Sequence, residues 1–200
     1  MKTLVIDYGS GNLRSVAKAL TASGFDVAIS SDPADAQGAD LLVLPGQGHF
    51  RQVARAFAAS GFEEAVRRHI ESDLPFLGIC VGLQLLFERS EEAPDTPGLG
   101  IVAGTVRRFS TGKVPQMGWN QVHLRPGPVF AELDGRYFYF VHSYYAPLVT
   151  DTAGEAEYEG TRYTALLVRG NLVAPQFHPE KSSRAGLAFL TLLHRHYAQR

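Results

Sequence analysis

The chain of 200 residues is short of several features, and each shortage excludes a class of protein. Its single cysteine cannot form an internal disulfide, which excludes a disulfide-stapled fold and indicates a reducing compartment. Its formal net charge of −1 offers no excess of positive charge for a nucleic-acid or membrane partner. No apolar run is long enough to span a bilayer. Met1-Lys2-Thr3 leads directly into the apolar Leu4-Val5-Ile6, so we expect no signal peptide and a cytoplasmic protein.

The order of apolar patterns predicts the fold class. Repeats, low-complexity tracts and linkers are missing, so we expect residues 1–200 to form a single domain. Apolar runs typical of strands alternate with helical spacings in the first half: strands at 2–6, 25–29, 41–44 and 76–79, helices at 12–22, 52–57 and 62–70. This alternation predicts an α/β fold with a largely parallel central sheet flanked by helices.

The second half of the chain has a different pattern. After Pro97 the segments become aromatic-rich and alternating, at 101–109, 122–124 and 137–145. A hairpin turn is expected at 169–172, and Ser182 or Ser183 would cap a last helix. We therefore expect this half of the sheet to be more antiparallel.

The only cysteine, Cys80, stands where a predicted strand meets a predicted helix. Gly78 and Gly82 flank it, which suits a sharp turn whose backbone passes close to its neighbours. The helical spacing of the apolar residues 83–87 begins just after it. At the start of a helix the thiolate, which attacks carbonyl carbon, is favoured over the thiol. A small buried hydrophobe at a strand end is the alternative, and the short G-x-C-x-G pattern leaves both interpretations open.

A second candidate group is Gln176-Phe177-His178-Pro179-Glu180, which follows an apolar run. If the strand continues through it, His178 and Glu180 project to one side and Pro179 marks the exit. A carboxylate can hold a histidine in one tautomer while its other nitrogen takes a proton from a thiol. Alone, this pattern is typical of a surface ion pair. Together with Cys80 it predicts the Cys-His-Glu arrangement of an acyl-transferring enzyme.

At these residues the chain resembles a known family. Segments 78–84 and 177–180 resemble the triad, or class I, glutamine amidotransferases, which hydrolyse glutamine through a cysteinyl thioester and pass the ammonia to a synthase. Segments 7–15, 115–120 and 180–182 resemble one subfamily of them. The resemblance covers essentially the whole chain. It implies glutamine as substrate, no cofactor, and a heterodimer with a separate cyclase chain, a (β/α)8 barrel, which makes imidazole glycerol phosphate and aminoimidazole carboxamide ribotide in histidine biosynthesis.

The resemblance also implies roles for individual residues. Cys80 would be the nucleophile, His178 the base and Glu180 its orienting partner. Backbone groups of one loop and of the residue after the nucleophile would form the oxyanion hole: Gly46, Gln47, Gly48 and Val81. Many relatives have glycine where this chain has Gln47, which puts a permanently formed oxyanion hole in doubt.

Two further sets follow from the same resemblance. The glutamine pocket would consist of Gly48, Gln84, Glu92, Ser143 and Tyr144. Gln84 lies one helical turn after Cys80, so both point the same way, although a purely structural hydrogen bond is the alternative for it. The interface with the cyclase would include Asn12, Met117, Trp119 and Lys181, which we expect to be largely exposed in the free chain.

Other functions stay open or are disfavoured. Gly9-Ser10-Gly11 lacks the third glycine of a dinucleotide-binding turn, and the seven histidines lack ligand neighbours, so we predict neither a nucleotide site nor a metal. The alternatives are a triad glutaminase that serves purine, pyrimidine, tryptophan or pyridoxal phosphate synthesis, and a stand-alone thiol hydrolase of the same fold. A non-catalytic regulatory module is disfavoured because all three triad positions are filled.

Overall fold

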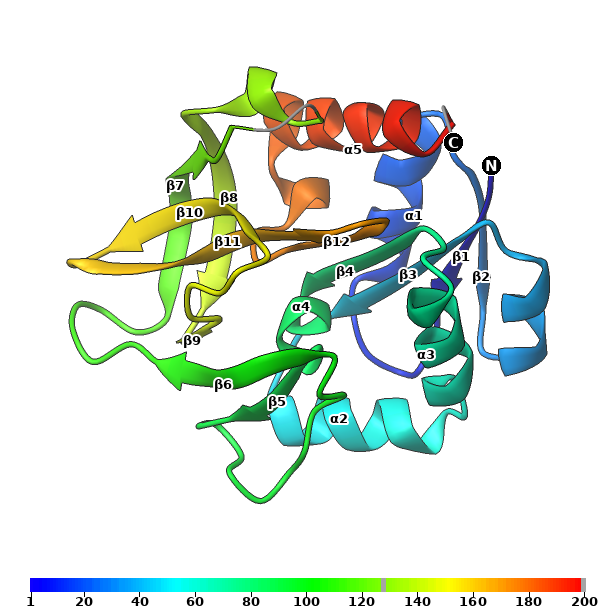
Figure 1. The fold of residues 1–200 in the computed structure, drawn as a ribbon, viewed down its shortest axis with the longest axis horizontal. Helices are drawn as coiled ribbons and strands as arrows, with labels where there is room; N and C mark the ends of the chain where they lie inside the picture. Colours follow the sequence, from blue (N-terminus) through cyan, green and yellow to red (C-terminus); the bar gives the residue numbers. More distant parts are fainter. Residues whose placement is uncertain (127–128, 199–200) are drawn as a thin grey trace.

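A nine-stranded mixed sheet runs through the centre of the computed structural model, which describes residues 1–126 and 129–198 (Figure 1). Residues 127–128 and 199–200 of the predicted single domain lie outside the described residues. One half of the sheet is parallel, in the order β2 (Asp26–Ser30), β1 (Lys2–Ile6), β3 (Leu41–Gly46), β4 (Phe76–Cys80) and β12 (Leu172–Pro175). The other half continues antiparallel, in the order β11 (Thr161–Arg169), β10 (Thr152–Tyr158), β7 (Gln116–Leu124) and β8 (Arg136–His142). The predicted α/β fold, parallel first and antiparallel later, is confirmed.

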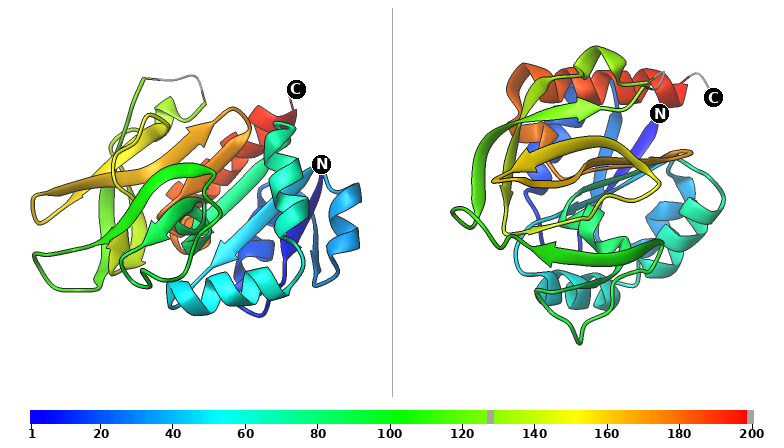
Figure 2. Two further views of the ribbon diagram at one scale, coloured as in Figure 1. Left: turned by 60° about the horizontal axis from the view of Figure 1, so that its bottom comes forward. Right: turned by 60° about the vertical axis from the view of Figure 1, so that its left-hand side comes forward.

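Helices cover both faces of the parallel half (Figure 2). One face carries α1 (Leu13–Ala22) and α5 (Ser183–Ala198), and the other carries α2 (Phe50–Ala59) and α3 (Glu63–Glu71). The shorter helices are α4 (Val81–Leu85) and the 3-10 turns η1 (Pro33–Gly38), η2 (Ala131–Leu133) and η3 (Pro179–Lys181). A second, three-stranded sheet consists of β5 (Phe87–Ser90), β6 (Val102–Arg108) and β9 (Tyr144–Tyr145). Among the described residues, no helix is long and apolar enough to cross a membrane.

The residue pattern explains the layers. Every residue of β3 and of β4 is buried, because helices cover both faces of the parallel strands. The outer strands β7 and β8 alternate between buried and more exposed positions, with one face of the hairpin on the core and one facing outward. Helix α2 buries one stripe of residues, Phe50, Val53, Ala54 and Phe57. The carboxyl ends of β3 and β4 therefore sit on a rigid base.

Several predicted elements have different bounds in the structure. The helix expected through residue 87 ends at Leu85, and Phe87 begins β5 by pairing with Val102. The run 122–124 is the end of the longer β7, and the run 137–145 is divided at Ser143 between β8 and β9. Both β10 and the full length of β11 were missed. Short apolar runs do not distinguish helix from strand, and here sheet pairing decides.

The strand before His178 is also shorter than predicted. It ends at Pro175, and the His178 amide then donates to the Tyr139 carbonyl of β8. Pro179 opens η3, a position that needs no amide donor. The hydroxyl of Ser182 contacts Tyr139 and His178 rather than the first amides of α5, although the Ser182 carbonyl does accept the Gly186 amide. His178 and Glu180 are therefore brought together by a turn and not by a strand.

Candidate active site

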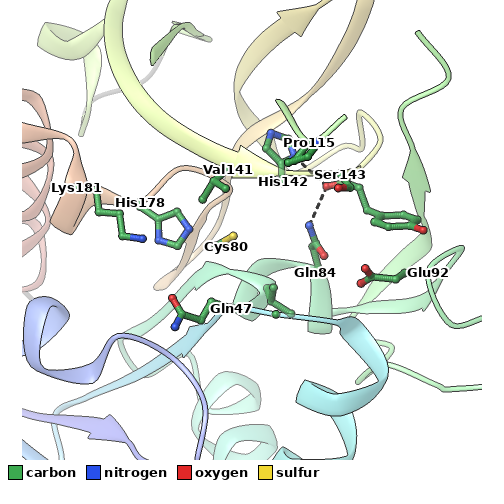
Figure 3. A pocket seen from close by; sticks show the side chains of 13 residues that line it. Gln47, Cys80, Gln84, Glu92, Pro115, Val141, His142, Ser143, His178 and Lys181 are labelled. Atoms are coloured by element: carbon green, nitrogen blue, oxygen red, sulfur yellow. Dashed lines mark hydrogen bonds between the residues drawn. The ribbon is translucent and has the colours of Figure 1, made fainter. Parts of the chain in front are cut away.

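A cavity of about 420 Å³ opens at the carboxyl ends of β3 and β4. Its walls come from segments far apart in the sequence: Gln47, Gly48, Cys80, Val81, Gln84, Glu92, Pro115, Val141, His142, Ser143, Tyr144, His178 and Lys181. Figure 3 shows His178 and Lys181 on one side of Cys80, and Gln84 and Glu92 on the other. The carboxyl edge of parallel strands is where α/β sheets commonly hold ligands. Most of the predicted catalytic and substrate-binding residues thus line one cavity.

Cys80 lies at a strained turn between β4 and α4. Its backbone has φ 55° and ψ −105°, an unusual conformation for a residue with a side chain. Gly82 is required beside it, because a Cβ there would lie 2.1 Å from the Leu44 carbonyl oxygen. A Cβ at Gly78 would lie 3.0 Å from the Gly82 oxygen. The sharp turn inferred from the two glycines is confirmed, and it holds the Cys80 side chain at the edge of the cavity.

His178 and Glu180 form a buried pair beside Cys80. His178 Nδ1 lies 2.8 Å from Glu180 Oε1, and the two side chains are 4% and 2% exposed. Burial alone would lower the pKa of His178, but the nearby Cys80 sulfur and the Glu180 carboxylate outweigh it and raise this pKa well above the ordinary imidazole value. Within the described residues His178 Nε2 is buried and has no hydrogen-bond partner. The raised pKa favours the protonated imidazolium form of His178 beside the Cys80 sulfur.

The predicted oxyanion loop follows β3. Gly46 pairs with Cys80 across the parallel strands, and a Cβ on it would lie 2.8 Å from the Gly82 nitrogen and 2.9 Å from Val81 Cβ. Only glycine therefore fits there without a shift. Gly48, two residues on, has φ 106°, a conformation that favours glycine. Gln47 and Gly48 line the cavity together with Val81.

A second segment holds this loop by two hydrogen bonds. The Tyr8 hydroxyl donates to the Pro45 carbonyl at 2.5 Å, and the Ser10 hydroxyl donates to the Gln47 carbonyl at 2.9 Å. Burial raises the pKa of Tyr8, so its hydroxyl stays a donor. The 7–15 segment, which resembles that of one subfamily, thus fixes the carbonyls of Pro45 and Gln47 on either side of Gly46.

The opposite wall of the cavity is a hydrogen-bonded network. Gln84 Nε2 donates to the Tyr144 carbonyl at 2.9 Å and to Gln176 Oε1 at 3.1 Å. Glu92 Oε2 accepts the Phe50 amide at 2.7 Å, at the start of α2. The Ser143 carbonyl accepts the Phe109 amide at 3.1 Å. Gln84 therefore both lines the cavity and makes the structural hydrogen bond that was its alternative interpretation.

The predicted interface residues lie outside the cavity, except Lys181. Met117 and Trp119 of β7 are 68% and 53% exposed on the outer face of the β7–β8 hairpin, and Tyr137 of β8 is 55% exposed. Lys181 is exposed at the rim of the cavity. Asn12 is half-buried rather than largely exposed, and its carbonyl accepts the Val16 amide at the start of α1.

Two residues that line or adjoin the site were not singled out from the sequence. His142 is buried, its Nδ1 lies 2.8 Å from the Tyr144 carbonyl, and its Nε2 has no partner among the described residues. Burial and, to a smaller extent, the neighbouring His178 together lower the pKa of His142 to about 4 despite that carbonyl. Gln176 Nε2 lies 3.6 Å from Cys80 Sγ. His142 precedes Ser143 and Tyr144, and Gln176 precedes His178, residues to which the sequence does assign roles. Only the fold shows what His142 and Gln176 contact.

The described residues also bear on metal binding. Nowhere in 1–126 or 129–198 do three His, Cys, Asp or Glu side chains gather closely enough to hold a metal ion. The cavity presents the Cys80 thiol and the His178 imidazole, and the buried Glu180 carboxylate contacts the imidazole. This set is suited to attack on a carbonyl carbon by sulfur.

Comparison with known proteins finds solved structures of the same fold and identifies the family of this chain. The solved structure of PurLQS from Thermotoga maritima superposes with a TM-score of 0.75 at 18% identity, over 98% of each chain. The imidazole glycerol phosphate synthase subunit HisH of Thermus thermophilus is 64% identical over 197 residues, which is 98% of each chain. HisH of Deinococcus radiodurans is 49% identical over 203 residues, covering 98% of this chain and 94% of the relative. The model of the family "Glutamine amidotransferase class-I" matches residues 4–192, and the chain belongs to this family.

Proposed function

We propose that this chain is the glutaminase subunit of an imidazole glycerol phosphate synthase. The observation that carries the proposal is the Cys80–His178–Glu180 constellation, in which Cys80 and His178 line the cavity and the buried Glu180 contacts His178. Its relatives named HisH support the choice of synthase, because they match nearly the full length of both chains. A cytoplasmic location fits the single cysteine.

The chemistry follows from the triad. The Cys80 thiolate attacks the side-chain amide carbon of glutamine, and a tetrahedral intermediate forms. His178 gives its proton to the departing nitrogen, which leaves as ammonia, and a thioester remains on Cys80. Water then attacks the thioester while His178 takes a proton from it, and glutamate and the Cys80 thiolate are released. Glu180 holds the His178 ring through Nδ1 in both halves of the reaction.

The remaining polar groups of the cavity suit the glutamine backbone. Glu92 uses one carboxylate oxygen on the Phe50 amide and keeps the other for the substrate's α-ammonium group. The segment at Ser143 and Tyr144 lines the same wall of the cavity and contacts the substrate together with Gln84. The amide of Val81 and an amide of the Gly46–Gly48 loop bind the oxyanion.

The oxyanion loop is also the proposed control point. Gln47 carries a side chain, so its peptide turns less freely than a glycine peptide toward the developing negative charge. The Tyr8 hydroxyl donates to the Pro45 carbonyl and the Ser10 hydroxyl to the carbonyl of Gln47 itself. Docking of the partner near segment 7–15 favours the orientation in which an amide points at the oxyanion. Lys181, next to Glu180, provides a second link between the docking face and the triad.

The partner is a separate cyclase chain with a (β/α)8 barrel, which forms a heterodimer with this chain and receives the ammonia. It uses the ammonia to form imidazole glycerol phosphate and aminoimidazole carboxamide ribotide. The exposed Met117, Trp119 and Tyr137 support a docking face on the β7–β8 hairpin, since large apolar and aromatic residues are enriched at the centres of interfaces. Asn12 and Lys181 would contact the partner from beside it.

Reconstitution tests this function. The purified chain is mixed with the cyclase chain of the same organism, and imidazole glycerol phosphate is measured with glutamine or with an ammonium salt as nitrogen source. We expect glutamine-dependent synthesis only when both chains are present. Binding to the synthase of another pathway, with no effect on the cyclase, would reassign the chain to another triad amidotransferase. Full glutamine turnover without any partner would favour a stand-alone hydrolase.

A further inference from the structure

Gln176 reaches the nucleophile from the side of the neighbouring strand. It follows β12, which pairs with β4, and it is fully buried. Its backbone amide donates to the Ala165 carbonyl at 2.9 Å, which fixes the start of the side chain. Its Nε2 lies 3.6 Å from Cys80 Sγ, a normal distance for a hydrogen bond to sulfur. A buried side-chain amide requires partners, and for Gln176 one of them is the reacting atom itself.

The orientation of this amide is determined by its neighbours. The Tyr144 carbonyl can only accept, so the Gln84 group that lies 2.9 Å from it must be the NH2 group. The same NH2 group lies 3.1 Å from the Gln176 side chain and donates its second hydrogen there, so the Gln176 atom that faces it is the oxygen. The Gln176 NH2 group therefore faces the sulfur. A backbone carbonyl thus sets both amide orientations.

We propose that Gln176 is a catalytic residue that donates a hydrogen bond to Cys80 Sγ and stabilises the thiolate. Hydrogen bonds to charged groups are stronger than neutral ones, and both partners of this one are buried, Gln176 at 0% and Cys80 at 3% exposed. The donor is an amide, so it does not change its protonation during the reaction. His178, by contrast, loses its proton to ammonia and regains one from water.

This difference gives Gln176 a defined place in the reaction, which rests on the proposed glutaminase function. When water attacks the thioester, the bond between carbon and Sγ breaks and the electron pair goes to sulfur. His178 is receiving the proton of the water at that moment. Gln176 offers a donor to the departing thiolate throughout. Its contribution should therefore appear both in the thiolate of the free chain and in turnover.

The first test titrates the thiolate without any substrate. Cys80 is the only cysteine, so the rate of alkylation of the full chain by iodoacetamide reports on this sulfur alone. In Gln176→Met, which removes the donor at similar length, we expect the pH of half-maximal alkylation rate to rise by about one unit, a roughly tenfold loss of thiolate below that pH. Gln121→Met is the matched control, because the Gln121 amide donates to the Gly135 carbonyl at 2.8 Å and does not line the cavity.

The second test is the pH profile of glutamate release in the presence of the cyclase chain. We expect kcat/KM of Gln176→Met to fall about tenfold on the acid limb and to recover at alkaline pH, where the thiolate forms anyway. Gln176→Asn keeps the amide but withdraws it by one methylene, so it should shift both profiles in the same direction even if the Met variant does not fold.

The outcomes separate this proposal from its alternatives. Unchanged alkylation and activity profiles in a folded Gln176 variant would overturn it. A uniform loss of activity at every pH, without a shift, would also overturn it and indicate packing against Gln84 instead. Alkylation needs no glutamine turnover. A chain that releases no glutamate would therefore refute the proposed function, and the alkylation profile would still show whether Gln176 stabilises the thiolate.

Discussion

The low pKa of His142, which lines the cavity, predicts how the stability of the protein depends on pH. His142 has a pKa of about 4 in the folded chain, against an ordinary value of 6.5, because burial disfavours the charged ring and the Tyr144 carbonyl offsets this only in part. In the unfolded chain the ring is solvated and takes up a proton near its ordinary value. Between these two values the unfolded chain therefore binds more protons at this position than the folded chain does. The contribution of His142 to stability therefore falls as the pH falls below 6.5, and this loss levels off below about 4.

The magnitude follows from the same two values. Each unit of pKa difference corresponds to about 1.4 kcal/mol, so the complete loss is about 3 kcal/mol. Between pH 7.5 and pH 5 the His142 ring becomes protonated in most unfolded chains. The free energy of unfolding should therefore fall by about 2 kcal/mol over this interval because of His142. His69 is buried too, and burial lowers its pKa, so it adds to the same trend. The total decrease alone does not isolate His142.

A matched variant isolates the contribution of His142. His142→Gln keeps an N–H that can donate to the Tyr144 carbonyl and cannot titrate. Urea unfolding of both proteins at pH 7.5 and pH 5 gives four free energies. We expect the wild type to lose about 2 kcal/mol more than the variant over this interval. Equal losses in the two proteins would refute the reasoning and show that His142 is solvated or charged in the folded chain.

Three further predictions concern the proposed function. Cys80→Ala should lose several orders of magnitude of glutamate release while ammonium-dependent synthesis in the complex survives, and a residual rate above about a tenth would exclude Cys80 as nucleophile. Trp119 is the only tryptophan, so its fluorescence should change when the cyclase chain binds, and Trp119→Ala should weaken that binding by about 2 kcal/mol, whereas Leu187→Ala on α5 should not. The isolated chain should release glutamate about a hundred- to a thousandfold more slowly than the complex with its nucleotide substrate, and equal rates would contradict a gate at Gln47.

The parts of the site that the sequence predicts best are those that local backbone chemistry requires. Gly78 and Gly82 flank Cys80 because the turn leaves no room for a Cβ at Gly82, and this requirement is visible as a spacing of glycines. The central parallel strands β3 and β4 are visible because they are buried on both faces and have continuous apolar sequences. The resemblance then added positions such as Glu92 that no local pattern indicates.

The elements that the sequence predicts poorly are those whose structure depends on a distant partner. Phe87 continues an apolar helical spacing, but pairing with Val102 makes it a strand residue. The strand expected to reach His178 ends earlier because the His178 amide turns to the Tyr139 carbonyl of β8. In both places the competing hydrogen bonds come from a segment that sequence periodicity does not include.

The same reason explains why the network behind the nucleophile is invisible in the sequence. The Gln84–Tyr144, Gln84–Gln176 and Gln176–Cys80 contacts join positions separated by 60, 92 and 96 residues. Each glutamine alone is an ordinary polar residue in an apolar neighbourhood, and its amide could face either way. Once the fold brings the Tyr144 carbonyl to Gln84, only one direction of donation is possible along the chain of amides, and it ends at the sulfur. The triad positions follow from local motifs, whereas the hydrogen bond that the nucleophile receives from Gln176 follows from topology.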